Sequence, residues 1–209
     1  MKILYNYDKL CFIGYSGCGK TTVVKAIIGH FPRKLILDTN REYEGGSTDN
    51  VLELTPTKIQ IYRPDEYHVG IVDEFVSQAR LFTNLHVVFE DLDLYGVKDF
   101  SKPLKALLIN GRHQGIGISL IARQINSLPS LAITQSSYIW LWRINPVAQN
   151  WSEYRTLQYA IPNLDRHFQF TKHEYVIYDM RANPAQGLYH FRCRCPECLI
   201  TSGAGVQNV

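Results

Sequence analysis

The feature that most constrains this chain is a glycine-rich segment near its start, residues 14–21, which reads GYSGCGKT. It matches the P-loop pattern G-x-x-x-x-G-K-[ST] at every fixed position. An apolar run, residues 10–13, precedes the segment, and a stretch with helical character, residues 21–28, follows it. Because this strand, loop and helix order is the context in which the motif binds phosphate, the sequence predicts a nucleotide site here.

The residue types in the loop explain how phosphate would be held. Glycines let the backbone curl so that successive N–H groups point at one anion, and the start of the next helix adds partial positive charge. Lys20 can reach the β- and γ-phosphates of a nucleotide, and the Thr21 hydroxyl can ligate Mg²⁺. The residues predicted to bind ATP are Gly14, Tyr15, Ser16, Gly17, Cys18, Gly19, Lys20, Thr21 and Thr22.

Length and composition indicate one globular domain. The chain has 209 residues, of which 45% are hydrophobic and 20% charged, as is ordinary for a folded domain of this size. We expect the domain to span residues 1–198, with a cysteine-rich end at 189–198, and residues 199–209 to form a flexible tail. No stretch approaches the roughly 18 consecutive apolar residues of a membrane span. Residues 1–8 are too few and too polar for a signal peptide, so an intracellular location is expected.

The charge distribution differs between the two halves of the chain. The net charge of +3 excludes a strongly basic nucleic-acid coat. Residues 1–110 hold 13 Lys and Arg against 14 Asp and Glu, whereas residues 111–209 hold 9 against 5, and eight of those nine are Arg. Because a guanidinium binds phosphate in two places at once, this excess favours phosphate recognition or contacts between subunits. A solvated surface position is the alternative for each arginine.

Three of the five cysteines lie close together near the end of the chain, at Cys193, Cys195 and Cys198, with His190 just before them. Three thiolates and an imidazole are a ligand set that zinc accepts. The usual signature of two separated Cys-x-x-Cys pairs is absent. Zinc binding, a disulfide and reduced thiols therefore all stay open.

Strand-like and helix-like segments alternate along the chain, which predicts an α/β fold with a mostly parallel sheet between helices. Residues 175–179 and 187–191 are expected to pair as a late antiparallel hairpin, and residues 44–50 to form a polar loop. Strands are expected at 9–13, 34–38, 58–63, 85–91, 116–124 and 136–144, and helices at 20–29, 66–83, 102–112 and 147–160.

Two acidic residues end the buried strand expected at 85–91, where a nucleotide hydrolase needs carboxylates. One acid of such a pair holds Mg²⁺ and another polarises the attacking water. We assign Glu90 to Mg²⁺ and Asp91 to water activation, with Asp93 as a further candidate. A solvated acidic turn is the alternative interpretation.

Two more residues are predicted to act in hydrolysis. Gln124 ends a buried strand, and the carboxyl ends of parallel strands are where a P-loop site lies, so its amide is expected near the γ-phosphate. Arg112 precedes that strand and should lie at the far edge from its own nucleotide, from where it could reach a neighbouring subunit as an arginine finger. Capping of a helix C-terminus is the alternative. Rival fingers are Arg63, Arg80 and Arg143.

Taken together, these segments resemble the HerA/FtsK superfamily of ring-forming, DNA-pumping ATPases. The likeness is greatest to viral genome-packaging ATPases of the poxvirus and turreted-icosahedral-virus kind. It is carried by the P-loop, by Leu35-Ile36-Leu37-Asp38 with the following Glu42-Tyr43, and by residues 111–124, GRHQGIGISLIARQ, which continue into Leu128-Pro129-Ser130. It covers residues 10–145, and Gln124 matches the sensor glutamine of the family.

The sequence departs from the family at two places. The order of Glu90 and Asp91 is the reverse of the usual Asp–Glu, which leaves the catalytic carboxylate in doubt. Arg123 stands directly before Gln124, where the family has a threonine, and the sequence gives it no role.

The resemblance implies a RecA-like core that assembles into a hexameric or pentameric ring, with ATP between subunits and double-stranded DNA through the centre. It implies ATP hydrolysis coupled to DNA translocation, and packaging of a viral genome into a preformed capsid with capsid or portal-vertex proteins as partners. The location would be the host cytoplasm, with the virion as the alternative. Pore residues would be Lys98, Lys102 and Lys105, for which a solvated helix face is the alternative.

Three other functions stay open. A cellular HerA/FtsK-like DNA-processing ATPase shares the core chemistry. A small-molecule kinase would need an arginine-rich lid, and none is evident between Asp91 and Ser136. A GTP-binding switch would carry Asn-Lys-x-Asp late in the chain; the nearest string is Thr171-Lys172-His173-Glu174, which precedes a strand instead of following one.

Overall fold

The computed structural model describes residues 4–55, 57–95 and 100–192. Within these residues the chain forms one mixed sheet with helices on both sides, as the alternating sequence pattern predicts. The strands are β1 Lys9–Ile13, β2 Lys34–Leu37, β3 Ser47–Thr48, β4 Ile59–Tyr62, β5 His86–Phe89, β6 Gly117–Ala122, β7 Tyr138–Leu141, β8 Tyr175–Asp179 and β9 Gln186–Phe191. The helices are α1 Lys20–Ile28, α2 Val69–Ala79, α3 Lys102–Asn110, α4 Ser130–Gln135 and α5 Ser152–Ala160.

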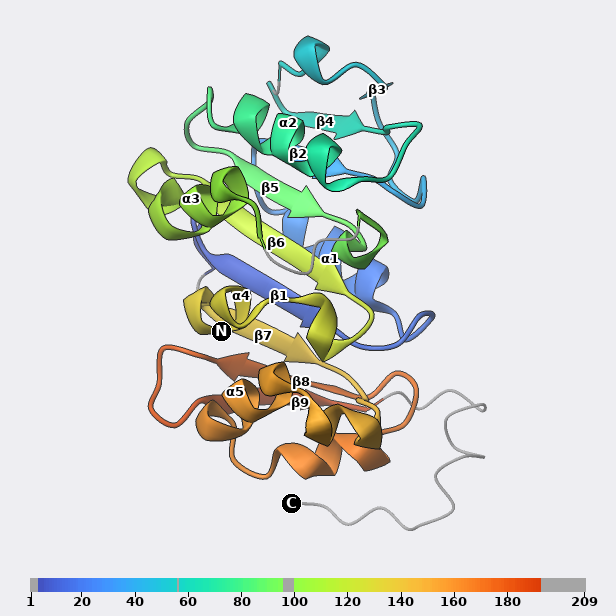
Figure 1. The fold of residues 1–209 in the computed structure, drawn as a ribbon, viewed down its shortest axis with the longest axis vertical. Coiled ribbons are helices and arrows are strands. Elements are labelled where there is room, and N and C mark those ends of the chain that lie inside the picture. The colour runs from blue at the N-terminus through green and yellow to red at the C-terminus, as the bar shows by residue number, and fades with distance from the viewer. Residues whose placement is uncertain (1–3, 56, 96–99, 193–209) are drawn as a thin grey trace.

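The order of strands in the sheet is β3-β4-β2-β5-β6-β1-β7-β8-β9 (Figure 1). The pairs from β3 to β7 are all parallel, and β8 and β9 are antiparallel. The P-loop strand β1 is central, between β6 and β7, and Ile13 is in register with Ala122 on one side and Leu141 on the other. The expected late hairpin is therefore confirmed, and the carboxyl ends of β5, β1 and β6 meet at one edge of the sheet.

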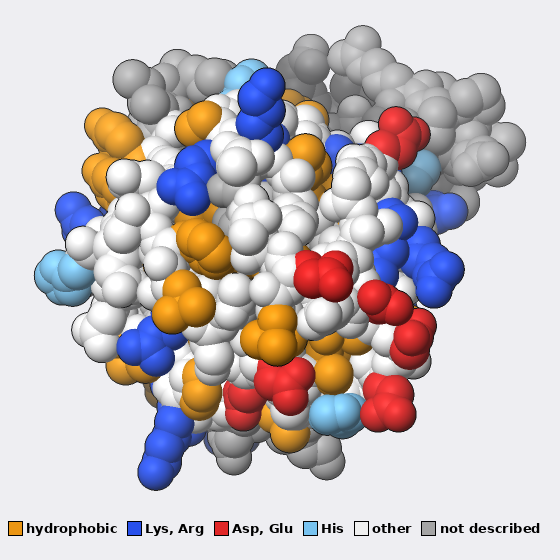
Figure 2. Space-filling view, turned by 90° about the horizontal axis from the view of Figure 1, so that it is seen from above, with side chains coloured by type: hydrophobic (Ala, Val, Ile, Leu, Met, Phe, Trp, Pro, Cys, Tyr) orange, Lys and Arg blue, Asp and Glu red, His pale blue; other side chains and the backbone are white. Residues whose placement is uncertain are grey.

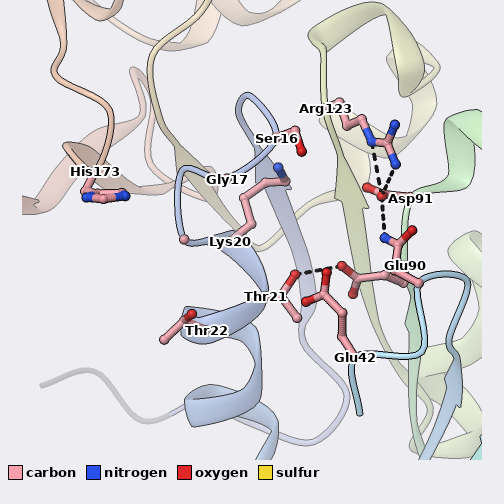
Figure 3. A pocket seen from close by; sticks show the side chains of 12 residues that line it. Ser16, Gly17, Lys20, Thr21, Thr22, Glu42, Glu90, Asp91, Arg123 and His173 are labelled. Atoms are coloured by element: carbon pink, nitrogen blue, oxygen red, sulfur yellow. Dashed lines mark hydrogen bonds and ion pairs between the residues drawn. The ribbon is translucent and has the colours of Figure 1, made fainter.

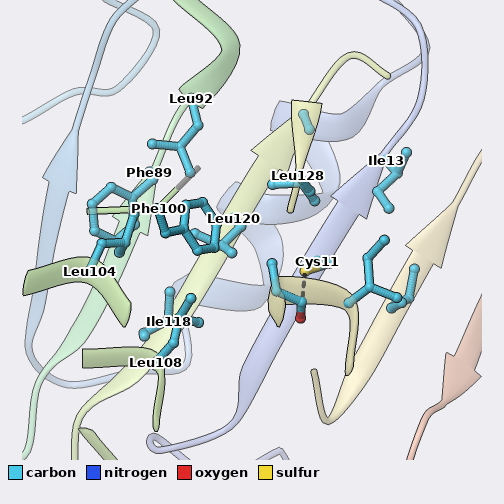
Figure 4. Packing of buried hydrophobic residues seen from close by; sticks show 14 of the residues in the cluster. Cys11, Ile13, Phe89, Leu92, Phe100, Leu104, Leu108, Ile118, Leu120 and Leu128 are labelled. Carbon is cyan, nitrogen blue, oxygen red and sulfur yellow. Dashed lines mark hydrogen bonds between the residues drawn. The ribbon is translucent and has the colours of Figure 1, made fainter. Parts of the chain in front are cut away.

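The two faces of the sheet are covered unequally (Figure 1). Helices α2 to α5 pack on one face, where Cys11 and Ile13 of β1 join the larger hydrophobic cluster. Figure 4 shows part of this cluster around Cys11 and Leu120. On the other face α1 packs against Phe12 and Leu10 in a smaller cluster that is rich in aromatic side chains. Because successive side chains of a strand point to opposite faces, a central strand buried on both faces must be apolar, as the buried part of β1 from Leu10 to Ile13 is.

Several predicted boundaries are wrong by a turn or more. The helix expected at 66–83 is only α2, Val69–Ala79, because the chain turns after Arg80 on its way to β5 and Leu81 lies exposed. The helix expected at 147–160 is interrupted by the extended backbone of Trp151, so α5 begins at Ser152. The polar loop at 44–50 contains the short edge strand β3, and α4 was not expected, since two and six residues are too few to show a period.

Parts of the predicted organisation fall outside the described residues. They are the cysteines Cys193, Cys195 and Cys198, the tail 199–209 and Lys98. Among the helices that the structure does describe, none has both the length and the apolar character required to cross a bilayer.

Figure 2 looks onto the end of the sheet formed by β3 and β4. Hydrophobic side chains lie scattered between charged ones on this face, and acidic side chains gather on one side of it. Leu52 and Tyr67 are among the exposed hydrophobic residues. This end of the molecule therefore presents mixed charge rather than a continuous basic surface.

His86, the first residue of β5, is completely buried at the amino edge of the sheet. Its ring stacks on Phe31 with centroids 4.1 Å apart. Nδ1 lies 2.9 Å from the carbonyl oxygen of Asn6 and Nε2 lies 2.8 Å from the Ser119 hydroxyl. Because a carbonyl only accepts, Nδ1 donates to it and Nε2 accepts from the hydroxyl, which is the neutral form. Burial lowers the pKa of His86 to about 4.

We expect the buried His86 to make the protein less stable in mild acid. Below pH 6.5 the unfolded chain binds a proton on this imidazole that the folded chain does not bind, so the free energy of unfolding falls as the pH drops from 6.5 towards 4. The contribution approaches about 1.4 kcal/mol per pH unit in that window. Urea unfolding of wild type and His86→Gln at pH 7 and pH 5 measures it as the difference between the two proteins. The exposed His113→Gln is the matched control, and a parallel loss of stability in wild type and His86→Gln would contradict the prediction.

Candidate active site

A cavity of about 530 Å³ opens at the carboxyl edge of the sheet, above the start of α1 (Figure 3). In parallel α/β sheets this edge is where ligands bind. Its walls come from the P-loop, from the turn after β2, and from the residues that directly follow β5 and β6. The lining residues are Ser16, Gly17, Gly19, Lys20, Thr21, Thr22, Asn40, Glu42, Glu90, Asp91, Arg123 and His173.

Two glycines of the P-loop are required by its geometry. A Cβ on Gly14 would lie 2.5 Å from Cβ of Trp142, so the chain there is pressed against the residue that follows β7. Gly19 has φ 93, in the left-handed region that favours glycine, and it directly precedes the first residue of α1. The loop thus turns sharply into the helix and leaves the N–H groups of the helix start facing the cavity.

Lys20 lies within the curve of the P-loop. Its Nζ donates hydrogen bonds to the carbonyl oxygens of Gly14, at 2.7 Å, and Tyr15, at 2.9 Å. The side chain is buried and also lines the cavity. A cation held at this depth beside the helix start is placed to bind an anion in the cavity.

Glu90 is tied to the P-loop helix by a hydrogen bond. The Thr21 hydroxyl donates to Oε1 at 2.9 Å, and the Tyr43 hydroxyl donates to Oε2 at 2.8 Å. Glu90 is only 1% exposed, and this burial raises its pKa to about 7 although both hydrogen bonds act in the opposite direction. A hydroxyl and a carboxylate side by side are oxygen donors of the kind that Mg²⁺ accepts, so these two residues fit the metal that the fold implies.

No group of three or more His, Cys, Asp or Glu side chains gathers around a potential metal position in the part of the chain that the structure describes. Mg²⁺ at a nucleotide does not need such a group. It is usually held by one or two protein oxygens, with waters and phosphate oxygens completing its octahedron.

Asp38, at the end of β2, organises the turn that brings further residues to the site. Its carboxylate accepts the backbone N–H groups of Glu42, at 2.9 Å, and Tyr43, at 3.2 Å. Arg63 adds an ion pair to the same buried carboxylate at 2.8 Å. These bonds to Asp38 hold the turn in place. As a result, Asn40 contacts Asp91 and Tyr43 contacts Glu90.

Asp91 carries the most heavily bonded carboxylate oxygen of the site. Its Oδ2 accepts hydrogen bonds from Nδ2 of Asn40, at 2.7 Å, and from Nη2 and Nε of Arg123, at 2.6 and 3.1 Å (Figure 3). The backbone of Asp91 has φ 45, which is uncommon for a residue other than glycine but is tolerated by aspartate. Asp93 lies two residues further along the chain, with Oδ2 4.0 Å from Nε of Arg123, and burial raises its pKa.

The structure separates the predicted phosphate-binding residues into two groups. Ser16, Gly17, Gly19, Lys20, Thr21 and Thr22 line the cavity. The other three support the loop: the carbonyls of Gly14 and Tyr15 hold Lys20, and the Cys18 side chain is buried in the α1-side cluster, where burial raises the pKa of its thiol.

Gln124 and Arg112 lie apart from the cavity. Gln124 is exposed and lines a small neighbouring hollow together with Tyr15 and Arg143. Arg112 is exposed at the opposite, amino edge of the sheet, where its guanidinium lies 5.3 Å from the ring centre of Tyr7. The far-edge position expected for Arg112 therefore holds, and the catalytic roles of both residues stay predictions.

Five residues of the site were not predicted as site residues, namely Asn40, Glu42, Tyr43, Arg123 and His173. His173 lies on the other side of the P-loop from Arg123 (Figure 3). Next to it, Cε of Lys172 is 3.6 Å from the position that a Cβ on Gly17 would occupy. Both belong to the string Thr171–Glu174, which the sequence marks only as a poor match to a guanine-binding motif. The only feature of the sequence that drew attention to this string is that it precedes a strand, β8, instead of following one.

No protein-family model matches the sequence, and no curated protein matches it. Solved structures do match. The genome packaging NTPase B204 from Sulfolobus turreted icosahedral virus 2 in complex with AMPPCP has a TM-score of 0.71 at 14% identity, over 87% of this chain and 96% of that one. Its complex with ATP-gammaS has a TM-score of 0.68 at 14% identity, over 88% and 97%.

A third match is B204 from Sulfolobus turreted icosahedral virus, described as a DNA-packaging ATPase. Its TM-score is 0.62 at 16% identity, over 87% of this chain and 97% of that one. At these identities the comparisons show a shared fold. The resemblance drawn from the motifs is confirmed at that level, and it extends beyond residues 10–145 because the matches cover most of both chains.

Proposed function

We propose that this protein is an ATP-hydrolysing motor that moves double-stranded DNA and packages a viral genome into a preformed capsid. The observation that carries the proposal is the convergence of Lys20, Thr21, Glu90 and Asp91 on one cavity. They converge in a fold shared with a protein described as a genome packaging NTPase and solved with the ATP analogues AMPPCP and ATP-gammaS.

The residues of the cavity divide the chemistry of hydrolysis among themselves. The N–H groups at the start of α1 and the Lys20 ammonium would bind the β- and γ-phosphates. Thr21 and Glu90 would hold Mg²⁺, which neutralises charge on the phosphate oxygens when bound. Asp91 would orient the attacking water and accept its proton. None of these steps requires a side chain that is not already on the cavity wall.

We further propose that the chain forms a ring in which Arg112 acts on the nucleotide of a neighbour. In a head-to-tail ring two different surfaces of the chain meet, so a finger must lie on a surface other than that of its own nucleotide. Arg112 meets this condition at the amino edge, and so does Arg80 at the end of α2. Arg63 is engaged with Asp38 in its own chain.

DNA would be contacted through its phosphates, without reading of sequence. Lys102 and Lys105 are both exposed at the start of α3, which is consistent with a place in such a contact. Capsid or portal-vertex proteins would be the further partners, and the site of action would be the host cytoplasm or the virion.

The proposal is tested by ATP hydrolysis with and without double-stranded DNA. We expect hydrolysis by the wild type to increase when DNA is added, and to be abolished in Lys20→Ala, which removes the cation at the phosphates. The matched control is Arg155→Ala, which removes an exposed cation of α5 that lies outside the cavity wall. If the rate of hydrolysis does not change with DNA, or if only GTP is hydrolysed, the proposal of a DNA motor is wrong. A small-molecule kinase or a GTP-binding switch would then be favoured.

A further inference from the structure

Arg123 is held next to the P-loop by the sheet itself. It directly follows β6, whose last residue, Ala122, is in register with Ile13 of β1. The carbonyl oxygen of Ala122 accepts the N–H of Gly14 at 3.2 Å. The backbone of Arg123 is therefore fixed beside the first residue of the phosphate-binding loop, and its side chain extends along the cavity wall towards the end of β5 (Figure 3).

The contacts of Arg123 distinguish the two oxygens of the Asp91 carboxylate. Nε and Nη2 both donate to Oδ2, and Asn40 donates to the same oxygen from the other side. Oδ1 accepts no hydrogen bond from any residue within the described ranges. The Asp91 side chain is 7% exposed and borders the cavity, whereas Arg123 is 36% exposed. Oδ2 thus accepts from three N–H groups, whereas Oδ1 remains available to a molecule in the cavity.

This difference between the two oxygens is important for a carboxylate that acts as a general base on water. A general base works through one oxygen aligned with the attacking water, and its second oxygen needs a partner that prevents rotation of the group. A guanidinium is suited to that task because two of its N–H groups can converge on one oxygen, and rotation of the carboxylate would then break both charge-assisted bonds. Asn40 alone, with a single N–H, would leave the group free to turn about its Cβ–Cγ bond.

We infer that Arg123 is a positioning residue, which holds Asp91 by Oδ2 so that Oδ1 faces the water that attacks the γ-phosphate. The inference rests on the proposed function, because it requires nucleotide hydrolysis at this site. The water oxygen bonds to the γ-phosphorus, and the bond from that phosphorus to the β,γ-bridging oxygen breaks. The proton of the water passes to Oδ1 and then to solvent, and ADP and phosphate leave.

The inference makes a specific kinetic prediction for Arg123→Gln. Turnover should fall by about 10²-fold, the size of effect expected when a reacting group is misplaced by about 1 Å. KM for ATP should change by less than about threefold, because phosphate binding stays with the P-loop. Arg123→Lys keeps the charge but offers a single nitrogen in place of the planar fork, so its turnover should lie between those of Arg123→Gln and wild type. Arg155→Gln is the matched control.

A double-mutant cycle with Asp91→Asn separates positioning from every other role. If Arg123 acts through Asp91, then Arg123→Gln should have no further effect on kcat in an Asp91→Asn background. Effects that multiply would overturn the inference, as would a rise in KM at unchanged kcat, which would instead indicate direct phosphate binding. Thermal unfolding of each variant shows whether the fold is kept, and if Arg123→Gln does not fold, Arg123→Lys carries the same cycle.

The double-mutant cycle is measured without DNA. It therefore tests the positioning role of Arg123 separately from the proposed movement of DNA. ATP hydrolysis that shows the coupling but ignores DNA would overturn the motor and keep the inference. Hydrolysis that increases with DNA but shows no coupling between Arg123 and Asp91 would support the motor and overturn the inference. A wild type that turns over no nucleotide would overturn both.

Discussion

Replacing Asp91 with asparagine is expected to reduce ATP turnover by about 10²–10⁴-fold, the usual contribution of a general base. Asparagine has the same shape and keeps an oxygen that can accept from Arg123 and Asn40, so the change removes the proton acceptor and little else. KM for ATP should stay within about threefold of wild type, since Asp91 does not belong to the P-loop. Steady-state phosphate release at saturating Mg²⁺ measures both quantities.

The companion variant Glu90→Gln should behave differently. Glu90 contacts Thr21, the other residue expected to hold Mg²⁺, and a glutamine keeps that contact while removing the negative charge. We expect the Mg²⁺ concentration for half-maximal hydrolysis to increase by about 10–100-fold, as for other residues that support a metal. High Mg²⁺ should recover much of the turnover in Glu90→Gln and none of it in Asp91→Asn. The reverse pattern would exchange the roles of the two acids.

The second large effect is expected from Arg112→Ala. If Arg112 stabilises the transition state in a neighbouring subunit, its loss should lower turnover by about 10³–10⁵-fold. Arg112 is exposed and makes no ion pair within the described part of the chain, so the fold should be unaffected. Arg80→Ala, at the same edge, tests the rival assignment, and Arg155→Ala is the control at an exposed position.

Mixing two inactive variants shows whether Arg112 acts between subunits. Lys20→Ala lacks its own phosphate site but still offers Arg112, and Arg112→Ala has an intact phosphate site but offers no finger. Random mixing in equal amounts would create complete sites at about a quarter of the interfaces of a ring. Hydrolysis that returns on mixing supports action in trans. If the mixture stays inactive although an affinity tag on one variant recovers the other with it, the assignment of Arg112 is wrong.

The sequence was sufficient to predict those parts of the site whose residues are neighbours in the sequence or directly follow a strand. The P-loop residues are consecutive, and Glu90 and Asp91 come directly after a strand whose apolar run is unmistakable, so their arrival at one edge follows from a parallel sheet. The order of the longer elements could be predicted for the same reason, although the short elements β3 and α4 were missed. Helix ends could not, because the end of α2 depends on how the chain returns to β5, which no local pattern records.

The residues that were missed depend on contacts between distant segments. Asn40 and Tyr43 reach the acids only because Asp38 folds the turn between them and β2. Arg123 contacts Asp91 only because β6 ends beside β5 in the sheet, which brings its guanidinium to that carboxylate. His173 comes to the P-loop from a segment about 150 residues further along the chain. Each of these placements is a consequence of tertiary structure.

The contact between Gly14 and Trp142 has a consequence for how this sequence can vary. The first glycine of a P-loop is ordinarily understood as a requirement of phosphate binding. Here a Cβ at position 14 would collide with the Trp142 side chain, which the hairpin behind it keeps in place. The nearest atom in that collision is Cβ of Trp142, which every residue except glycine carries. Shortening the side chain at 142 would therefore leave the collision in place, and relatives with alanine at 14 are expected to have glycine at 142 or a shifted backbone there.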